Sequence, residues 1–278
     1  MLTTDDHRRD SAGLRYVYPV ISRRAGGVSV GINLNVNNAC NWACLYCQVD
    51  NLTRGGPPPV DLDLLEQELA TFLEDALYGD FMLRQVPPES RDLMDVAFSG
   101  NGEPTSAAEF HQAILRVGEV LRRFGLDGKL PLRLITNGSM LHRPAVREGI
   151  RALGELGGEV WFKVDRATAA DVVAINGVPL DTEKLARNLE HCAALASTWV
   201  QTCWFALDGR APDAAARDAY CALLKPLAPR LAGVHLYGLA RPSLQPAALR
   251  LTRLAASELE GFAAEVTKKT GIRVMVSP

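Results

Sequence analysis

Val28-Ser-Val-Gly-Ile-Asn-Leu-Asn35 leads almost directly into Asn38-Ala-Cys40-Asn-Trp-Ala-Cys44-Leu-Tyr-Cys47-Gln48. The first stretch alternates apolar and small or polar residues, and this period of two predicts a β-strand with one apolar face. The second stretch places three cysteines within eight residues at the end of that strand. A cysteine loop at the carboxyl end of a first strand is therefore the starting point for predicting the fold.

Strand-like and helix-like segments alternate through the rest of the chain. The expected strands cover residues 28–35, 93–98, 131–136, 159–164, 199–205 and 233–237. Helical apolar stripes cover 62–76, 107–123, 146–153 and 220–227, Asp181 is a candidate N-cap for another helix, and Ser257 with Glu260 resembles a capping box for a last helix. This alternation predicts an α/β fold with a parallel sheet, either open and doubly wound or curled into a partial barrel.

Composition excludes several classes of protein. Of the 278 residues, 47% are hydrophobic and 22% charged, as in ordinary soluble globular proteins. The net charge of −2 gives no broad electrostatic basis for binding nucleic acid. No apolar stretch is long enough for a bilayer, and the first residues lack the apolar region of a secretory signal, so we expect a cytoplasmic protein without membrane contact.

The three neighbouring cysteines predict a metal centre. Soft sulfur ligands select iron–sulfur clusters or zinc. A structural zinc site normally has four ligands, and no histidine or further cysteine lies near the loop. Three ligands and one open position favour an iron–sulfur cluster with one iron free to bind a small molecule. A zinc loop completed by a distant residue, or chance clustering, remains an alternative.

Cys40-x3-Cys44-x-Tyr46-Cys47 after a first strand resembles the signature of the radical S-adenosylmethionine (radical SAM) superfamily. Phe98-Ser-Gly100-Asn101-Gly102-Glu103-Pro104-Thr105 is similar to the glycine–glutamate motif of that family. Further matching motifs end the third, fourth and sixth strands; they are Thr136-Asn137-Gly138, Lys163-Val-Asp165 and His235-Leu-Tyr-Gly-Leu-Ala-Arg241-Pro242. The series is most similar to the branch that contains tRNA wyosine-type synthases and bacterial relatives without a known substrate.

The resemblance implies a fold and a chemistry. The fold would be a partial (β/α)6 barrel of parallel strands over 28–245, with an N-terminal arm over 1–27 and a helical extension over 246–278 packed on the barrel. Cys40, Cys44 and Cys47 would hold a [4Fe–4S] cluster that reductively cleaves S-adenosylmethionine, and the resulting 5′-deoxyadenosyl radical would abstract hydrogen from a substrate. An electron donor such as a flavodoxin or a ferredoxin would supply the reducing electron.

The resemblance also assigns cofactor-binding residues. Glu103 would receive the methionine amino group, from a turn in which the small residues Gly100 and Gly102 allow close approach of the backbone. Lys163 and Asp165 share one face of their strand; they would bind the methionine carboxylate and the ribose hydroxyls, or satisfy each other as a buried ion pair. The remaining candidates for S-adenosylmethionine are Asn101, Asn137 for the ribose or methionyl group, and Tyr46 near the adenine.

The substrate is not identified by these motifs. Gln201 and Cys203 would share one face of the fifth strand and, with Tyr237, line the pocket. Arg241 is either an anchor for a carboxylate or phosphate or a surface arginine. Modified tRNA, a peptide and a small metabolite are candidate substrates, and the near-neutral charge argues mildly against tRNA. A zinc-stabilised binding module and a non-catalytic iron–sulfur scaffold are the rival functions.

Overall fold

The computed structural model describes residues 1–3, 12–22 and 26–278, which form two compact units. Unit 1 consists of Met1–Asn41, Gly55–Ile135 and His142–Glu159. Unit 2 consists of Trp42–Arg54, Thr136–Leu141 and Val160–Pro278. Strands and helices alternate along both units, as the sequence predicts.

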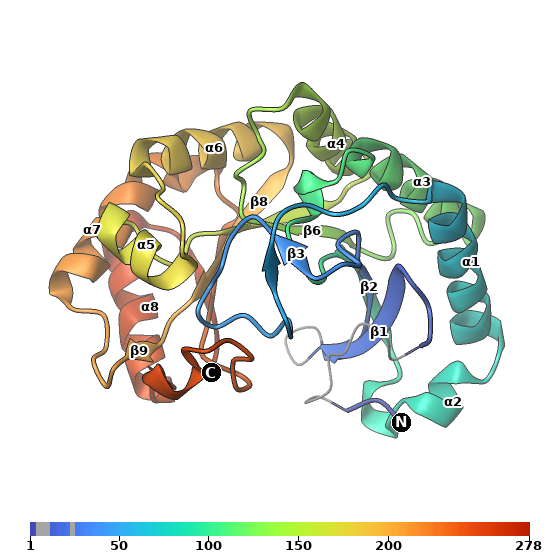
Figure 1. Cartoon of the computed structure of the whole chain (residues 1–278), viewed down its shortest axis with the longest axis horizontal. Coiled ribbons are helices and arrows are strands. Elements are labelled where there is room, and N and C mark those ends of the chain that lie inside the picture. The colour runs from blue at the N-terminus through green and yellow to red at the C-terminus, as the bar shows by residue number, and fades with distance from the viewer. Residues whose placement is uncertain (4–11, 23–25) are drawn as a thin grey trace. The chain divides into compact units, whose positions relative to one another are not determined.

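Four of the described strands of unit 1 are neighbours in one sheet, in the order β1-β2-β5-β6, and the short strand β3 lies outside that sheet. The first pair is antiparallel, whereas β2, β5 and β6 are parallel to one another. The helices α1, α3 and α4 lie on one side of these strands (Figure 1). The bounds are β1 Val17–Ser22, β2 Gly27–Ile32, β3 Ala39–Cys40, β5 Leu93–Phe98, β6 Leu132–Thr136, α1 Leu62–Tyr78, α2 Phe81–Gln85, α3 Phe110–Arg123 and α4 Pro144–Glu155.

Unit 2 contains strands in the order β7-β8-β10-β12, of which β8, β10 and β12 are parallel. The helices α6, α7 and α8 lie along one side of these strands (Figure 1). The short strands β9 and β11 pair antiparallel. The bounds are β4 Thr53–Arg54, β7 Glu159–Lys163, β8 Ser197–Cys203, β9 Ala206–Leu207, β10 Gly233–Tyr237, β11 Leu251–Thr252, β12 Val274–Ser277, α5 Ala169–Asn176, α6 Thr182–Leu195, α7 Ala214–Leu224 and α8 Ala256–Thr270.

Strand β8 shows how unit 2 separates its two faces. The Thr198 hydroxyl lies 3.6 Å from the Cys192 sulfur of α6, and the Thr202 hydroxyl lies 2.6 Å from the Tyr220 hydroxyl of α7. Because side chains alternate along a strand, Gln201 and Cys203 point to the opposite, helix-free face. The carboxyl ends of the strands and this helix-free face carry the residues predicted to have a function.

All six strands expected from the sequence are present, as β2, β5, β6, β7, β8 and β10. Asp181 is the N-cap of α6, where its carboxylate accepts a hydrogen bond from the Glu183 amide at 2.9 Å. The capping box predicted at Ser257 and Glu260 is wrong by two residues. The helix α8 begins after Ala255, whose amide donates to the Glu258 carboxylate at 2.8 Å.

Strand β1 and helix α5 were not expected. β1 falls within the segment 1–27 that the sequence indicated as an arm, of which 4–11 and 23–25 lie outside the described residues. Pro19 in this strand lacks an amide donor, and β1 tolerates it because it is the edge strand. The buried Glu68 of α1 accepts hydrogen bonds from the Tyr16 and Val17 amides at 2.7 and 3.3 Å, which fixes the start of β1.

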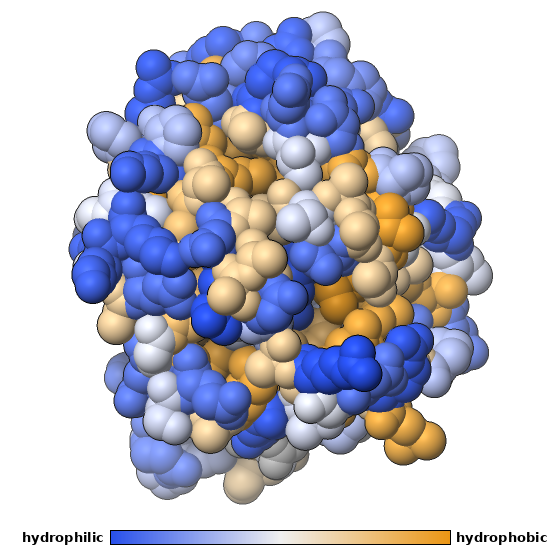
Figure 2. All heavy atoms as spheres, turned by 90° about the vertical axis from the view of Figure 1, so that its left-hand side faces the viewer, coloured by the Kyte–Doolittle hydropathy of each residue, from blue (hydrophilic) through white to orange (hydrophobic). Residues whose placement is uncertain are grey.

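The side of unit 2 that carries α5 to α8 presents hydrophilic residues with hydrophobic patches between them (Figure 2). The large exposed apolar side chains of this unit come from different elements; they are Val173, Leu244, Leu249 and Met275. Isolated exposed apolar residues are normal on folded proteins. Among the described residues, none of the helices is both long and apolar enough to traverse a lipid bilayer.

Candidate functional site

Two buried asparagines of unit 1 shape the loop that leads from β2 to Cys40. The Asn33 side-chain oxygen accepts hydrogen bonds from the amides of Asn35 and Asn101, both at 3.1 Å. The Asn35 side chain donates to the Ala39 carbonyl at 3.0 Å. The first cysteine therefore follows a loop whose backbone is fixed by side chains that the sequence analysis did not assign.

The glycines of the glycine–glutamate motif lie against this same loop. Gly100 has φ of +153°, and a Cβ added there would lie 2.3 Å from the Asn33 side-chain oxygen. A Cβ at Gly102 would lie 2.2 Å from the Ala39 carbonyl oxygen. The sequence predicts glycines that let a ligand approach; what the structure places against them is the chain's own cysteine loop.

Glu103 is buried at the end of this motif, with 3% of its surface exposed. Its Oε1 accepts hydrogen bonds from the Thr105 amide and hydroxyl at 3.1 and 2.6 Å. These bonds cap the 3-10 turn η2 (Pro104–Ser106) and hold the carboxylate in place. Next to it, the Asn101 side chain donates to the Asn38 side chain at 2.6 Å.

In unit 2, Asp165 connects the second half of the cysteine loop to the ends of β7 and β8. Its Oδ1 accepts a hydrogen bond from the Cys203 amide at 2.9 Å. Its Oδ2 accepts from the Tyr46 hydroxyl at 2.5 Å and from the Asn176 side chain at 2.8 Å. The hydrogen bonds of Asp165 thus come from Cys203, Tyr46 and Asn176, which form a network centred on its carboxylate.

Asn176 is the residue of this network that the sequence analysis missed. Its Nδ2 lies 3.2 Å from the Cys44 sulfur, and its carbonyl accepts from the Ala43 amide at 3.0 Å. The Leu45 amide donates to the Ile175 carbonyl at 2.8 Å. The carboxyl end of α5 therefore docks on the cysteine loop. The pair Asn176-Gly177 was the available signal, because glycine directly after a helix marks its end.

A second segment of unit 2, about 200 residues further along the chain, also forms hydrogen bonds with the cysteine loop. The Ser243 hydroxyl donates to the Leu45 carbonyl at 2.6 Å, and the Leu244 amide donates to the Cys47 carbonyl at 3.0 Å. The Gln245 side chain donates to the Val49 carbonyl at 2.7 Å. We call residues 243–245 the strap; it begins two residues after Arg241, which is half-buried.

Charges around the loop are set by burial and by neighbouring groups. Burial raises the pKa of the Cys44 thiol to about 12, which outweighs the opposing influence of Lys163. Burial opposes the charge of Lys163, yet Cys44, Tyr237 and Asp165 outweigh it and raise the pKa of Lys163. The ammonium lies 5.0 Å from the centre of the Tyr46 ring, a favourable cation–π position. The groups around Lys163 therefore favour its charged form.

The predicted substrate residues lie at and just before the ends of β8 and β10. Burial raises the pKa of the Cys203 thiol well above its usual range, and the Tyr237 side chain forms a hydrogen bond with it. Gln201 pairs with His235 across the β8–β10 ladder, two residues before the corresponding pair of Cys203 and Tyr237. Three of the predicted residues thus share the helix-free face of unit 2.

Asn137 and Arg166 form hydrogen bonds with the backbone just after the ends of β6 and β7. The Asn137 side-chain oxygen accepts from the Ser139 amide at 3.0 Å, which shapes the turn after β6. The buried Arg166 guanidinium donates to the carbonyls of Asp165 and Cys203 at 2.7 and 3.2 Å, and it lies 4.4 Å from the Trp204 ring. Arg166 braces the two strand ends, and no sequence pattern indicated this role.

Comparison with solved structures identifies the fold. A structure of TYW1 with a lysine–pyruvate adduct bound has a TM-score of 0.58 and 13% identity over 96% of this chain and 80% of that one. A radical SAM methyltransferase from Sphaerobacter thermophilus has a TM-score of 0.61 and 14% identity over 94% and 68%. The chain has the radical SAM fold. It is the partial barrel of mostly parallel strands that the motifs implied.

Other comparisons add less. A structure of anSMEcpe with AdoMet and a peptide bound has a TM-score of 0.54 and 18% identity, covering 89% of this chain and 62% of that one. Among curated proteins, the GTPase Obg of Brachyspira hyodysenteriae is 24% identical over 135 residues, which are 48% of this chain and 17% of that protein. The chain thus spans less than a fifth of that GTPase. No family model matches the sequence.

The radical SAM fold implies a cluster, and the cysteines have suitable chemistry for one. All six cysteines are free thiols. The Asn176 N–H next to the Cys44 sulfur would stabilise a thiolate, which is the form that binds metal. Cys40 belongs to unit 1, whereas Cys44 and Cys47 belong to unit 2. In the part of the chain that the structure describes, no three His, Cys, Asp or Glu side chains are arranged around a metal position, so convergence of the cysteines stays a prediction.

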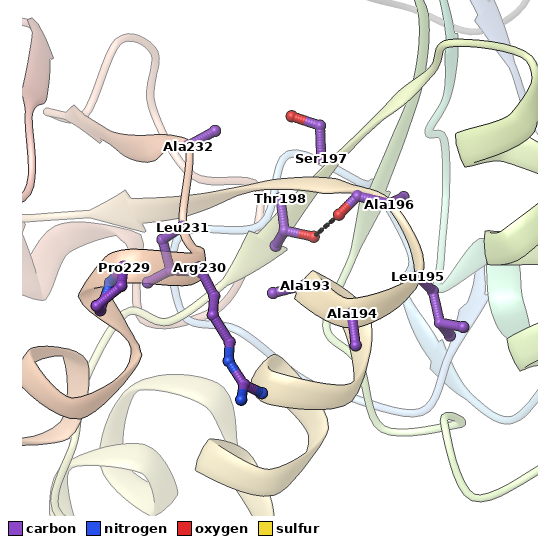
Figure 3. Close-up of a pocket in the computed structure, with 10 residues that line it drawn as sticks. All are labelled: Ala193, Ala194, Leu195, Ala196, Ser197, Thr198, Pro229, Arg230, Leu231 and Ala232. Atoms are coloured by element: carbon purple, nitrogen blue, oxygen red, sulfur yellow. Dashed lines mark hydrogen bonds between the residues drawn. The ribbon is translucent and has the colours of Figure 1, made fainter.

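A surface hollow of about 450 Å³ lies elsewhere on unit 2 (Figure 3). It is lined by the end of α6, the start of β8 and residues 229–232. The Thr198 hydroxyl donates to the Ala196 carbonyl there at 2.9 Å. The hollow lies at the amino end of β8, whereas Cys203 and the predicted site lie at the carboxyl end of that strand.

Proposed function

We propose that this chain is a radical SAM enzyme that holds a [4Fe–4S] cluster on Cys40, Cys44 and Cys47. The observation that supports this most directly is the cysteine loop, whose free thiols stand beside a buried network at the strand ends of a chain with the radical SAM fold. When bound, the cluster and S-adenosylmethionine together supply a 5′-deoxyadenosyl radical that takes a hydrogen atom from the substrate.

The chain's own residues would bind and orient the cofactor. Lys163, whose pKa is raised by Cys44, Tyr237 and Asp165, is the candidate partner for the methionine carboxylate. Glu103 is held by Thr105 and is the candidate partner for the methionine amino group. Asp165 has its own donors, so its proposed part is to fix Tyr46 and the loop and to offer its remaining lone pairs to the ribose.

A carbonyl-attacking role for Lys163 is less favoured. The TYW1 structure carries a lysine–pyruvate adduct, and a lysine forms such an adduct only as a free amine. The groups around Lys163 raise its pKa, which favours the protonated form over the free amine. We therefore assign Lys163 to ion pairing.

The test is anaerobic purification followed by measurement of iron, sulfide and zinc per chain, and then addition of S-adenosylmethionine and dithionite. The expected result is a cluster and formation of 5′-deoxyadenosine. Cys44→Ala is expected to lose both. Cys221→Ala is the matched control, because Cys221 is similarly buried but lies on α7, and it is expected to keep both.

The alternatives give different results in the same experiment. Zinc without iron would identify a zinc-stabilised binding module. A cluster that forms no 5′-deoxyadenosine with any candidate substrate would identify a scaffold. Replacing dithionite with a flavodoxin or a ferredoxin and its reductase tests the proposed physiological electron donor. The substrate remains one of three proposed classes: tRNA, peptide or small metabolite.

A further inference from the structure

Gln201 stands out on the helix-free face of unit 2. The residue is 3% exposed, yet no residue that the structure describes forms a hydrogen bond with its side-chain Oε1. A buried polar atom without a partner destabilises the folded protein. The backbone of Gln201 is engaged, since its carbonyl accepts from the Val164 amide at 3.1 Å, so the strand itself is regular at this point.

Aromatic rings line this face next to Gln201. The His235 ring stacks on Trp199 with 4.3 Å between ring centres and lies 4.4 Å from Trp161. His235 is the cross-strand neighbour of Gln201, and neighbours on one face of a sheet lie within contact distance. The rings give the carboxamide an apolar and flat surrounding, in which a hydrogen bond is stronger than in water.

The same face is not sealed by side chains. Lys163 and Tyr237 keep partial exposure, and so does His235. Met275, which pairs with His235 from β12, is 54% exposed. The helix-free face is therefore partly exposed at His235, the cross-strand neighbour of Gln201.

We infer that Gln201 is the recognition residue of a substrate subsite for a planar amide, that is, a carboxamide or lactam that presents an N–H beside a C=O. A carboxamide carries one acceptor oxygen and one donor nitrogen, so it pairs in two hydrogen bonds with a group of this kind. The flanking rings favour a flat partner by stacking. The inference rests on the proposed function, because it places the subsite where that enzyme would hold its substrate.

Two ring compounds that differ in one N–H test this inference. 2-Pyridone presents N–H and C=O side by side, and N-methyl-2-pyridone has the same ring without the donor. Binding to the purified holoenzyme is measured by ligand-observed NMR titration. The expected result is that 2-pyridone binds at least about tenfold more tightly, because one lost hydrogen bond in a buried site leaves its partner unpaired.

Variants separate recognition from folding. Gln201→Leu keeps the size of the side chain and is expected to weaken 2-pyridone binding at least about tenfold while its melting temperature stays equal or rises, since an unpaired polar group is removed. Thr198→Val, on the same strand but facing α6, is the control and is expected to retain binding.

Three results would overturn the inference: equal binding of both pyridones, unchanged binding by Gln201→Leu, or no binding of 2-pyridone. No binding of 2-pyridone by the unmodified enzyme, together with a lower melting temperature of Gln201→Leu, would mean that the carboxamide already contributes to the folded state and takes no ligand. The NMR titration measures the affinity for the pyridones and not catalytic turnover. Failure to form 5′-deoxyadenosine would therefore end the proposed function without deciding the binding result.

Discussion

Asn176 joins three parts of unit 2 through one side chain, which makes it the sharpest point at which to perturb the site. Its Nδ2 donates to the Asp165 carboxylate at 2.8 Å and lies 3.2 Å from the Cys44 sulfur. Asn176→Ala removes both interactions and leaves the backbone bond to the Ala43 amide in place. The expected outcome is a less stable apo-protein with a loosened cysteine loop.

The magnitude follows from what Asn176 contacts. A hydrogen bond to a charged group contributes roughly 1.5–3 kcal/mol. In this variant Asp165 still accepts hydrogen bonds from the Cys203 amide and the Tyr46 hydroxyl. Its carboxylate therefore keeps two donors, and the lower part of the range applies. We expect Asn176→Ala to reduce the free energy of unfolding by about 2 kcal/mol.

Asn188→Ala is the matched control. Asn188 also lies in a helix, in the interior of α6 rather than at a helix end, and its side chain donates to the neutral carbonyl of Gly138 at 3.0 Å. Its expected cost is about 1 kcal/mol. Urea unfolding of apo-protein in the presence of a reductant measures both variants.

A double-mutant cycle with Asp165→Asn isolates the interaction of Asn176 with the carboxylate. We expect a coupling energy of at least about 1 kcal/mol. An Asn176→Ala variant no less stable than Asn188→Ala, or a coupling energy near zero, would refute the claim that this side chain anchors the loop to the strand ends.

Three further predictions concern other parts of the chain. Gly102→Ala should reduce the free energy of unfolding in urea by about 1–3 kcal/mol, because its Cβ would meet the Ala39 carbonyl, whereas Gly56→Ala, with open space around it, should change it little. Ser243→Ala combined with Gln245→Leu removes the side-chain donors of the strap and should cost about 2 kcal/mol, with faster amide hydrogen exchange over residues 45–49. Burial raises the pKa of the Cys192 thiol from 9.0 to about 12, so the folded state favours the neutral thiol and loses stability as pH rises above the ordinary value. Between about pH 9 and 11, the free energy of unfolding in urea should therefore fall with pH less steeply in Cys192→Ala than in the unmodified chain, by up to about 1.4 kcal/mol per pH unit. Equal pH dependence in the two proteins would contradict the stated burial effect.

The regular part of the fold was predictable because its physical cause is local. Period-two and continuous apolar runs indicated the six strands β2, β5, β6, β7, β8 and β10, but not the two-residue strand β3 that carries Cys40. Helix α5 was missed because it is short and has no apolar stripe: Val172 and Ile175 are buried, but Val173 is 50% exposed. Strand β1 was missed because the charges and the glycine pair of residues 1–27 indicated an arm, and the edge position that permits Pro19 is set by the sheet order and not by a local pattern.

Candidate site residues could be predicted where they belong to a short sequence motif. Residues that hydrogen-bond to the motif from far away in the sequence could not. The cysteines, Glu103 and Asp165 belong to short motifs. Asn176 contacts Cys44 across 132 residues, and Ser243 contacts Cys47 across 196. No local pattern encodes such a pairing, since an asparagine or a serine in a turn is ordinary in either case.

These distant supports bear on how the cluster would assemble. In small metal domains the bound metal supplies the energy that orders the ligands. Here the second half of the cysteine loop is ordered by Asn176, Asp165 and the strap, all of which are protein groups. The part of the loop in unit 2 is then already ordered before a metal binds, so the chain should stay folded when Cys44 is replaced by alanine. A Cys44→Ala variant without cooperative unfolding would mean that the metal, and not the protein network, orders this loop.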